Sequence, residues 1–522
     1  MPTLDWIGKD KVVNHHMDVP YRVLEKKYSY GEDSDNMIIH GDNLSALKSL
    51  LPQYEGKIKC IYIDPPYNTG NEGWVYNDNV NDPRIVEWLG KVVGTEGEDL
   101  SRHDKWLCMM YPRLKLLHRL LADDGVIFIS IDDNEQANLE LICDEIFGVA
   151  NFIQMIIWNK RVSPARDAKF FSTDHEYILV FAKNKSFLTT HFLPRTEKNN
   201  SYYKNPDNDP RGSWNSAAYT CNKSKEERPN LFYPLINPFT GEEVYPKESA
   251  VWAYSKETYE EHVKNNLLWW GIDGSAKQPR KKAFLSEVGD IVPRSVWNYS
   301  DVGSTQKATL ENNEIFGERK FSYPKVSSLI ERVLQIATDK DSIILDSFAG
   351  SGTTAHAVLN MNKSDGGNRK FILIEMMDYA DTITAERVRR VIDGYGEGKK
   401  AVEGTGGGFA FYELGEKLLD GEYLNENVGI DKIREYVYFT ETKEKVTSKP
   451  DEPHYLGTAF DTAYYFYYEK DKATTLDWAF LETIKTKTQG YVIYADRCIL
   501  TDEELEKYHI TFKKIPRDIT RL

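Results

Sequence analysis

Cysteine is scarce in this chain of 522 residues, and long apolar runs are absent from it. The five cysteines, at positions 60, 108, 143, 221 and 498, form no Cys-x-x-Cys pair and no zinc-binding spacing. We therefore expect a reducing compartment, no disulfide framework and no metal. No apolar run approaches the length of a membrane helix, and the first residues lack a cationic segment followed by an apolar core. These features predict a cytoplasmic protein without membrane contact.

The chain also lacks the positive charge that indiscriminate nucleic-acid binding requires. It carries 66 Lys and Arg against 81 Asp and Glu, a net charge of −15. The charge is uneven, because residues 151–325 hold 25 basic and 21 acidic side chains. A locally basic segment in an acidic chain suits phosphate contacts at one place with little nonspecific binding elsewhere. A surplus of this size is also compatible with chance.

The most informative string is Asp64-Pro65-Pro66-Tyr67, which follows the apolar run Cys60–Ile63. The run suits a strand buried on both faces, and two successive prolines cannot continue it. The chain must therefore leave the sheet at this point. It then presents a carboxylate, a rigid backbone and an aromatic ring at the carboxyl end of a strand, where open α/β sheets bind ligands.

A second strand and turn are predicted at residues 342–354, which read Ser-Ile-Ile-Leu-Asp-Ser-Phe-Ala-Gly-Ser-Gly-Thr-Thr. Gly350 and Gly352 allow the backbone to approach a ligand, and either threonine can cap the helix that follows. No Gly-Lys-Ser/Thr follows here or elsewhere, which excludes a Walker phosphate loop. Glu375 ends the next strand, where a carboxylate that holds ribose hydroxyls is expected in a Rossmann-like sheet. For the glycines alone, an ordinary tight turn remains an alternative.

Strand and helix patterns alternate on both sides of a long middle segment, which predicts one doubly wound α/β sheet built from two separated stretches. Between about 185 and 320 these patterns fade into sequence rich in Asn, Pro, Gly and Trp. Residues 68–100 predict a long loop, and Gly404–Gly408 a linker to a small α+β region. Strands are expected at Met37–Ile39, Cys60–Ile63, Val126–Ile131, Phe152–Trp158, Tyr177–Ala182, Ile343–Asp346 and Phe371–Ile374, and helices at Asn43–Leu51, Lys105–Ala122, Asn134–Phe147 and Val326–Thr338.

Taken together, these strings resemble the amino-methylating DNA methyltransferases that use S-adenosylmethionine. Asp64–Tyr67 is similar to their catalytic motif and Phe348–Gly352 to their cofactor loop, and this order resembles the permuted β class. The chain is most like the modification (Mod) subunits of type III restriction-modification systems. Further strings with counterparts there are His40–Leu44, Asp64–Gly70, Gly125–Glu135 and His175–Ala182.

The resemblance implies a Rossmann-like, doubly wound, seven-stranded methyltransferase sheet with an inserted target-recognition domain and a small α+β C-terminal region. The implied parts are an N-terminal segment (1–34), the catalytic half of the methyltransferase domain (35–185), the target-recognition domain (186–320), the cofactor half (321–400) and a C-terminal domain (401–522).

The implied activity is methyl transfer to the N6 amine of an adenine that is flipped out of duplex DNA. Asp64 and the carbonyl of Pro65, fixed by Pro66, would each accept one N–H of the amine, and Tyr67 would stack on the base. Two acceptors favour the pyramidal nitrogen that attacks the methyl donor. The implied cofactor residues are Asp42, Asn43, Asp346, Phe348, Gly350, Gly352, Thr353 and Glu375. A helix cap at Asp42 and a core aromatic at Tyr67 are the structural alternatives.

Basic and aromatic residues are interleaved just after the strand that ends at Trp158, in a pattern that suits a DNA backbone and an unstacked base. They are Asn159, Lys160, Arg161, Arg166, Lys169, Phe170 and Phe171. A second basic cluster consists of Lys277, Arg280, Lys281 and Lys282. A solvated loop that covers Phe170 and Phe171 is an equally simple interpretation of the first cluster.

Three functions compete. Adenine-N6 methylation of double-stranded DNA is favoured, because the resemblance links Asp64 to adenine and the long insert to duplex DNA. Cytosine-N4 or RNA methylation uses the same chemistry. A noncatalytic specificity subunit is disfavoured because both motifs are intact. By resemblance we expect a homodimer and a separate ATP-dependent restriction (Res) subunit, and a solitary methyltransferase remains open.

Overall fold

The computed structural model describes residues 3–69, 102–166, 168–421 and 423–517. The loop predicted at 68–100, with Trp74 and Trp88, lies outside the described residues except at its first two positions. The chain divides into two compact units, one made of Met1–His191 with Arg294–Leu522 and the other of Phe192–Pro293. In the described part of the chain, none of the helices combines the length and apolar character needed to cross a bilayer.

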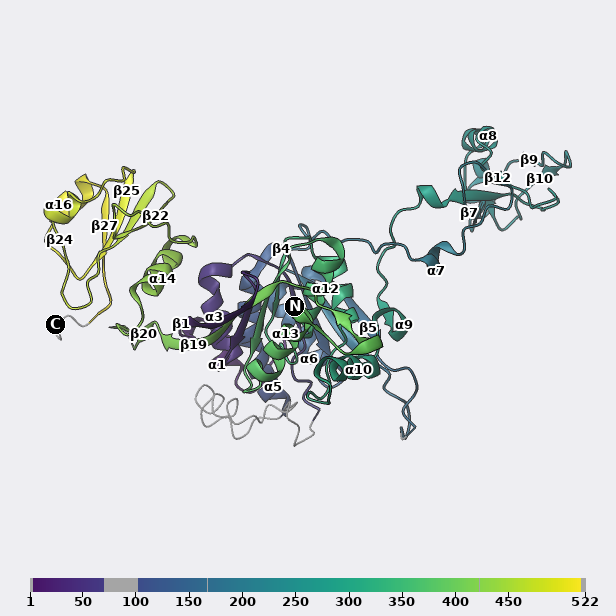
Figure 1. Cartoon of the computed structure of the whole chain (residues 1–522). Helices are drawn as coiled ribbons and strands as arrows, with labels where there is room; N and C mark the ends of the chain where they lie inside the picture. Colours follow the sequence, from purple (N-terminus) through teal and green to yellow (C-terminus); the bar gives the residue numbers. More distant parts are fainter. Residues whose placement is uncertain (1–2, 70–101, 167, 422, 518–522) are drawn as a thin grey trace. The chain divides into compact units, whose positions relative to one another are not determined.

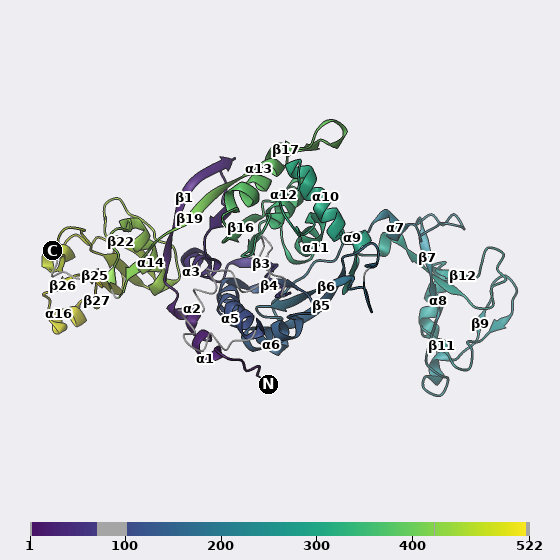
Figure 2. The ribbon, with the colours of Figure 1, turned by 90° about the horizontal axis from the view of Figure 1, so that it is seen from below.

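The first unit is built on a mixed sheet of ten strands, with helices on both faces (Figures 1 and 2). From edge to edge its strands are β1 (Arg22–Gly31), β19 (Gly408–Lys417), β2 (Met37–His40), β16 (Lys370–Glu375), β15 (Ile343–Asp346), β3 (Ile58–Ile63), β4 (Leu121–Ile131), β6 (His175–Ala182), β5 (Phe152–Asn159) and β14 (Val296–Asn298). The seven from β2 to β5 are the predicted methyltransferase sheet. Three further strands extend its edges.

The centre of the sheet joins two distant parts of the sequence. β15 pairs in parallel with β3, so that Ile344 lies opposite Cys60 and Leu345 opposite Ile61. The chain proceeds from β3 to β4 on one side and from β15 to β16 on the other, and all these neighbours are parallel. The strand order therefore reverses between β3 and β15. This is the switch point at which doubly wound sheets bind ligands.

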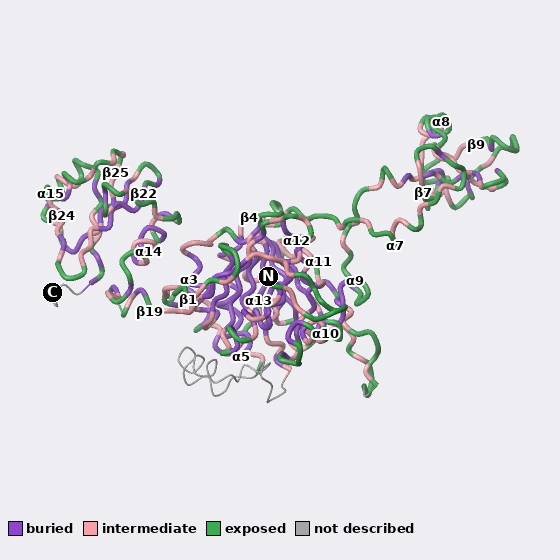
Figure 3. The backbone as a smooth tube through the Cα atoms, viewed as in Figure 1, coloured by how far each residue is buried: buried purple, intermediate pink, exposed green. Residues whose placement is uncertain are grey.

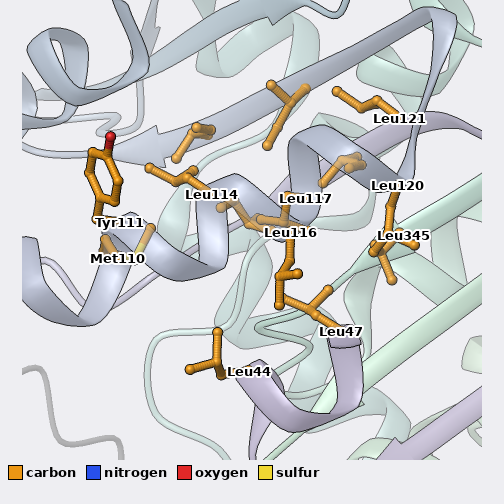
Figure 4. Close-up of a cluster of buried hydrophobic side chains, with 14 of the residues drawn as sticks. Leu44, Leu47, Met110, Tyr111, Leu114, Leu116, Leu117, Leu120, Leu121 and Leu345 are labelled. Atoms are coloured by element: carbon orange, nitrogen blue, oxygen red, sulfur yellow. The ribbon is translucent and has the colours of Figure 1, made fainter. Parts of the chain in front are cut away.

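Leucine-rich helices hold this sheet from one face. α3 (Asn43–Tyr54) and α5 (Arg102–Leu120) pack against each other, and leucines such as Leu47, Leu114 and Leu117 are fully buried between them and the strands (Figure 4). Each such side chain contributes about 1.5–3 kcal/mol through burial. α6 (Gln136–Phe147) packs beside α5. Buried residues are concentrated in the strands and the adjoining helices (Figure 3).

The opposite face carries α11 (Ser327–Ala337), α12 (Thr353–Asp365) and α13 (Glu386–Asp393), which pack in sequence (Figure 2). The predicted helix and strand positions agree closely with these elements, with two corrections. α5 ends at Leu120 because the chain already enters β4 at Leu121. Neither threonine caps α12, because Gly352 is its N-cap and the threonine hydroxyls bond elsewhere.

The N-terminal segment and the start of the C-terminal region also belong to this sheet. β1 pairs antiparallel with β19, which in turn pairs in parallel with β2. The predicted linker at Gly404–Gly408 is therefore one residue too long, because Gly408 is the first residue of β19 and pairs with Gly31. Beyond β19, α14 (Ile430–Thr442) precedes a four-stranded sheet of β22 (Tyr455–Ala459), β23 (Thr462–Phe466), β25 (Gly490–Ala495) and β27 (Ile510–Lys514), which is the expected α+β region.

The second unit, Phe192–Pro293, is smaller than the insert expected from sequence, because β14 and α10 (Thr305–Phe316) belong to the first unit. It contains a three-stranded sheet of β12 (Leu268–Trp269), β13 (Arg280–Phe284) and β7 (Trp214–Ala218), and helix α8 (Lys256–Lys264). Its residues carry 14 basic and 14 acidic side chains. The positive surplus of residues 151–325 therefore comes from the flanking segments of the first unit.

One lysine of the second basic cluster has a structural role. Lys282 is 1% exposed, and its Nζ lies 2.5 Å from Asp207 Oδ2 and 3.0 Å from Asp209 Oδ2. Such a buried, paired ammonium is unsuited to a DNA phosphate. Lys282 is thus removed from the candidate phosphate contacts, whereas Arg280 is exposed.

Candidate active site

The two sequence motifs meet in one cavity of about 250 Å³ at the carboxyl ends of β3 and β15. Its lining combines Asp64, Pro65 and Tyr67 from the first motif with the turn after β15 and with the segment that precedes α11. The lining residues are Tyr62, Asp64, Pro65, Tyr67, Thr69, Glu176, Phe321, Ser322, Tyr323, Pro324, Lys325, Asp346, Phe348, Ala349, Gly350, Ser351, Thr353 and Thr354.

The backbone after β3 is held on both sides. Trp106 Nε1 of α5 donates to the carbonyl of Pro66 at 2.7 Å. Asn68 follows in the left-handed conformation, with φ of 59°, and its buried amide donates to Glu135 and to the carbonyl of Arg102. Asparagine tolerates this conformation better than most residues. These anchors fix the direction in which Asp64 and Tyr67 point.

Asp64 belongs to a cluster of opposite charges that is largely shielded from solvent: the side chains of Asp64, Lys325 and Glu176 are 24%, 11% and 8% exposed. Lys325 Nζ donates to both carboxylate oxygens of Asp64, at 2.7 Å each, and to the Tyr67 hydroxyl at 3.0 Å. That hydroxyl in turn donates to Asp64 Oδ1 at 2.8 Å and lies 3.0 Å from Glu176 Oε2. On the far side of Glu176, Lys160 Nζ donates to Oε1 at 2.8 Å. Two lysines thus balance two carboxylates.

Burial and pairing shift the pKa values of this cluster in opposite directions. Burial raises the pKa of Asp64, although Lys325 opposes the rise. Burial also acts to raise the pKa of Glu176, but Lys325 and Lys160 outweigh it and hold that pKa below its ordinary value. The pKa of Lys325 is raised, because its two carboxylate neighbours more than offset burial. Lys325 is therefore an ammonium, and its charge favours the ionised form of Asp64.

The turn after β15 uses glycines where other residues would be strained. Gly350 and Gly352 have φ of 52° and 82°, and a Cβ on Gly352 would lie 3.0 Å from the carbonyl of Thr384. Gly350 donates its N–H to Glu375 Oε2 at 2.8 Å. Glu375 also accepts the N–H of Met377 at 2.9 Å. The carboxylate after β16 therefore braces the turn.

Asp346 closes the base of the same turn. Its Oδ1 accepts the N–H of Phe348 at 3.0 Å, and its Oδ2 accepts the hydroxyl of Thr354 at 2.5 Å. Burial raises its pKa to about 7, and burial raises the pKa of Glu375 to about 7 as well. Two acidic side chains near neutrality at a glycine turn are typical of a ligand site.

Asp42 and Asn43 lie beside this turn but outside the cavity lining drawn from the described residues. Asp42 caps α3 by accepting the N–H of Ser45 at 2.8 Å, so the helix-cap interpretation is correct for that oxygen. Asn43 donates to the carbonyl of Ser347 at 3.2 Å and accepts from Arg113 Nε at 2.5 Å. Pro66, Gly352 and Glu375 are likewise neighbours of the cavity rather than part of its described wall.

Sequence reasoning missed Lys325 and gave Glu176 no role. Glu176 is the second residue of β6, and its approach to Asp64 follows only from the strand order, in which β4 alone separates β6 from β3. Lys325 stands after Tyr323-Pro324 and directly before α11. The sequence feature that could have indicated Lys325 is its position after a proline, just before the helix that leads to β15.

Comparisons with known proteins agree with this geometry. The family model described as DNA methylase matches residues 58–386, and the chain belongs to this family. The Mod subunit of the type III restriction-modification enzyme StyLTI from Salmonella typhimurium is 33% identical over 417 residues, which are 74% of this chain and 62% of that protein. The EcoPI Mod subunit from Escherichia phage P1 is 34% identical, over 72% of this chain and 63% of that protein.

A third relative, the type II methyltransferase M.KpnI from Klebsiella pneumoniae, is 34% identical over 67% of this chain and 82% of that protein. The chain thus spans less than two thirds of the length of both Mod subunits.

The raised pKa of Asp346 predicts a pH-dependent cost to stability. The folded chain keeps a proton that the unfolded chain releases near pH 4, so this carboxyl's contribution to stability falls as the pH rises towards about 7. Asn at position 346 can still accept from Phe348 and donate to Thr354. The melting temperature of Asp346→Asn, relative to the wild type, should therefore rise by a few degrees between pH 5 and pH 8.

Asp365→Asn is the matched control, because Arg369 lowers the pKa of that carboxyl at the end of α12. Its difference from the wild type should be constant over this pH range. Parallel curves for Asp346→Asn and the wild type would contradict the assignment of a protonated Asp346.

Proposed function

We propose that this chain is a site-specific DNA methyltransferase that transfers a methyl group from S-adenosylmethionine to the N6 amine of an adenine in duplex DNA. The observation that carries this proposal is the single cavity lined by Asp64, Tyr67 and the glycine turn. It joins a hydrogen-bond acceptor for an amine to a backbone that a ligand can approach closely.

The turn at Gly350–Gly352 fits the proposed cofactor. Positive φ and the lack of side chains leave its backbone accessible, and it opens the N-terminus of α12, which favours a carboxylate end. Asp346, Phe348, Gly350 and Thr353 line the cavity and would hold the cofactor directly. When bound, S-adenosylmethionine supplies an electrophilic methyl group. Glu375 would support the cofactor indirectly, by holding the turn through the N–H of Gly350. Asp42 and Asn43 would act indirectly as well, with Asn43 holding the side of the turn at Ser347.

Asp64 would accept one N–H of the target amine and the Pro65 carbonyl the other, which localises the nitrogen lone pair towards the donor. Both residues line the cavity. The Tyr67 hydroxyl is tied to Asp64, which would fix its ring beside the base. The nitrogen that has gained a methyl group must lose one proton, and Asp64, which would already accept its N–H, would receive that proton.

The choice of adenine rests on the resemblance of Asp64–Tyr67 to adenine-specific enzymes. Cytosine-N4 methylation is the alternative, because the matched family covers N6 and N4 methylation under one description. We also propose a type III assignment, with a homodimer and a separate ATP-dependent Res subunit, on the strength of the Mod relatives. The M.KpnI relative keeps a solitary or type II enzyme open. A cytoplasmic location follows from the proposed substrate.

Contacts with DNA are proposed at two places. The unit Phe192–Pro293 would be the target-recognition domain, and its neutral charge balance suits base reading better than backbone attraction. The connection between β5 and β6 would hold the duplex next to the cavity. Its Phe170 and Phe171 are 83% and 92% exposed, so the interpretation of a loop that covers them is wrong. Arg161 and Lys169 beside them are exposed as well.

The catalytic role of Asp64 is tested by Asp64→Ala. Methyl transfer should fall by about 10²–10³-fold or more, because the amine loses its charged acceptor, while cofactor affinity is largely kept. Transfer of tritium from labelled S-adenosylmethionine to DNA measures the rate, and calorimetry the affinity. Asp124→Ala, at an exposed carboxylate that pairs with Lys59, is the control. Tritium transfer near the wild-type rate would refute the assignment.

The glycine turn is tested by Gly350→Val. A branched side chain in the cavity wall should lower the affinity for S-adenosylmethionine by about tenfold or more, as measured by calorimetry. Gly366→Val is the matched control, because Gly366 has φ of 66° at the other end of α12 and open space around a Cβ. If both variants bind the cofactor equally, the turn has no cofactor role.

The exposed phenylalanines are tested by the double variant Phe170→Ala/Phe171→Ala. If these rings support the duplex when the adenine leaves the stack, methylation of a fully paired site should fall by about tenfold or more. Placing the target adenine opposite an abasic position should restore most of the rate, because less pairing must be broken. The substrate is the host site mapped by long-read sequencing of methylated adenines.

Phe460→Ala, at a phenylalanine of the C-terminal region that is 88% exposed, controls for loss of an exposed ring. An equal loss of rate on both duplexes would show that Phe170 and Phe171 contribute only structure.

A further inference from the structure

Lys325 occupies the position that the target amine would need. Its ammonium is a nitrogen with several N–H donors, it lies 2.7 Å from both oxygens of Asp64, and it also reaches the Tyr67 hydroxyl. The proposed function gives the adenine amine the same acceptor. Lys325 takes an acceptor site on each oxygen of Asp64, and Tyr67 takes a further site on Oδ1, so an entering amine competes with the lysine for this carboxylate.

A second acceptor is already in place. Glu176 Oε2 lies 3.5 Å from Lys325 Nζ, and the side chain of Glu176 is 8% exposed. Glu176 Oε1 is bound by Lys160, and its Oε2 has the Tyr67 hydroxyl and Lys325 as neighbours. A small movement of the ammonium therefore exchanges one carboxylate for the other without exposing either charge.

We propose that Lys325 is a positioning residue that holds Asp64 ionised and aligned in the base-free site and transfers to Glu176 when the target amine binds. This proposal rests on the proposed function. The exchange moves hydrogen bonds only: the ammonium keeps its protons, and no covalent bond forms or breaks.

Charge balance explains why the exchange needs both partners. In the wild type, Asp64 and Glu176 carry two negative charges against two positive charges on Lys325 and Lys160. Loss of Lys325 leaves two largely shielded carboxylates with one cation, and such a carboxylate without a partner shifts towards its protonated form. A protonated Asp64 cannot accept the N–H of the amine as a carboxylate does. Among the residues that the structure describes, the other ionisable groups that face this cluster are Tyr62, Tyr67, Asp132 and Asp346.

The test is the single-turnover rate of methyl transfer as a function of pH, measured with the full chain, S-adenosylmethionine and the mapped duplex. For Lys325→Met, the acid limb of the pH–rate profile should move at least one unit to higher pH. On the acid side of that limb the rate should be about tenfold or more below the wild type, and it should recover as the pH rises. Lys325→Arg should keep the wild-type limb. A purely structural role would lower the rate equally at every pH.

Two further variants make the prediction specific. Glu176→Gln leaves Lys325 with Asp64 as its carboxylate partner, so the acid limb of this variant should move to lower pH. Its KM for DNA should rise, because the lysine then has no second carboxylate to which it can move. The double variant Lys325→Met/Glu176→Gln restores charge balance, and its limb should return towards that of the wild type. Lys59→Met is the control: it removes a lysine of β3 that pairs with Asp124, and it should leave the pH–rate profile unchanged.

Other outcomes overturn the proposal. If calorimetry shows that Lys325→Met loses more than tenfold in affinity for S-adenosylmethionine, Lys325 binds the cofactor instead of supporting Asp64. If Glu176→Gln keeps the wild-type KM for DNA, Glu176 is not the second acceptor, and if the double variant has the same acid limb as Lys325→Met, charge balance does not control Asp64. If the wild-type chain methylates no DNA, the proposed function itself is refuted. This outcome differs from the preceding ones, in which the wild type is active and only the variants depart from expectation.

Discussion

The parallel pairing of β3 with β15 is the interaction on which the rest of the site depends. About 280 residues separate Asp64 from Asp346 in the chain, yet their strands are direct neighbours in the sheet. The pairing brings the carboxylate after β3 and the glycine turn after β15 to one edge. The ten-stranded sheet and its two helix layers are the scaffold that keeps these two ends in register.

Burial of charge is the second constraint. A carboxylate that is largely removed from water is unstable by itself, because burial favours its protonated form. In the cluster of Asp64, Glu176, Lys325 and Lys160, two ammonium groups balance the two carboxylates at the wall of the cavity. Asp346 and Glu375 meet the same problem differently: backbone N–H groups and a hydroxyl hold them, and their pKa values lie near neutrality.

Much of the scaffold could be predicted from sequence, because buried strands and amphipathic helices have local signatures. Ile343–Asp346 matches its strand at both ends, and Asp64 and Gly350 stand where the turns were expected. What local patterns do not contain is the partner across the sheet. Glu176 approaches Asp64 because of the strand order, and Lys325 reaches Asp64 from a segment about 260 residues away in the chain. In the same way, Gly408 belongs to the sheet because it pairs with the distant Gly31.

The central claim is that the cavity methylates the N6 amine of adenine in duplex DNA. The most direct measurement is mass spectrometry of nucleosides from DNA that carries the mapped site and has been incubated with the purified chain and S-adenosylmethionine. We predict that N6-methyl-2′-deoxyadenosine is formed from duplex DNA by the wild type and is absent with Asp64→Ala. N4-methylcytosine, or no methylated nucleoside from a folded chain that binds the cofactor, would contradict it.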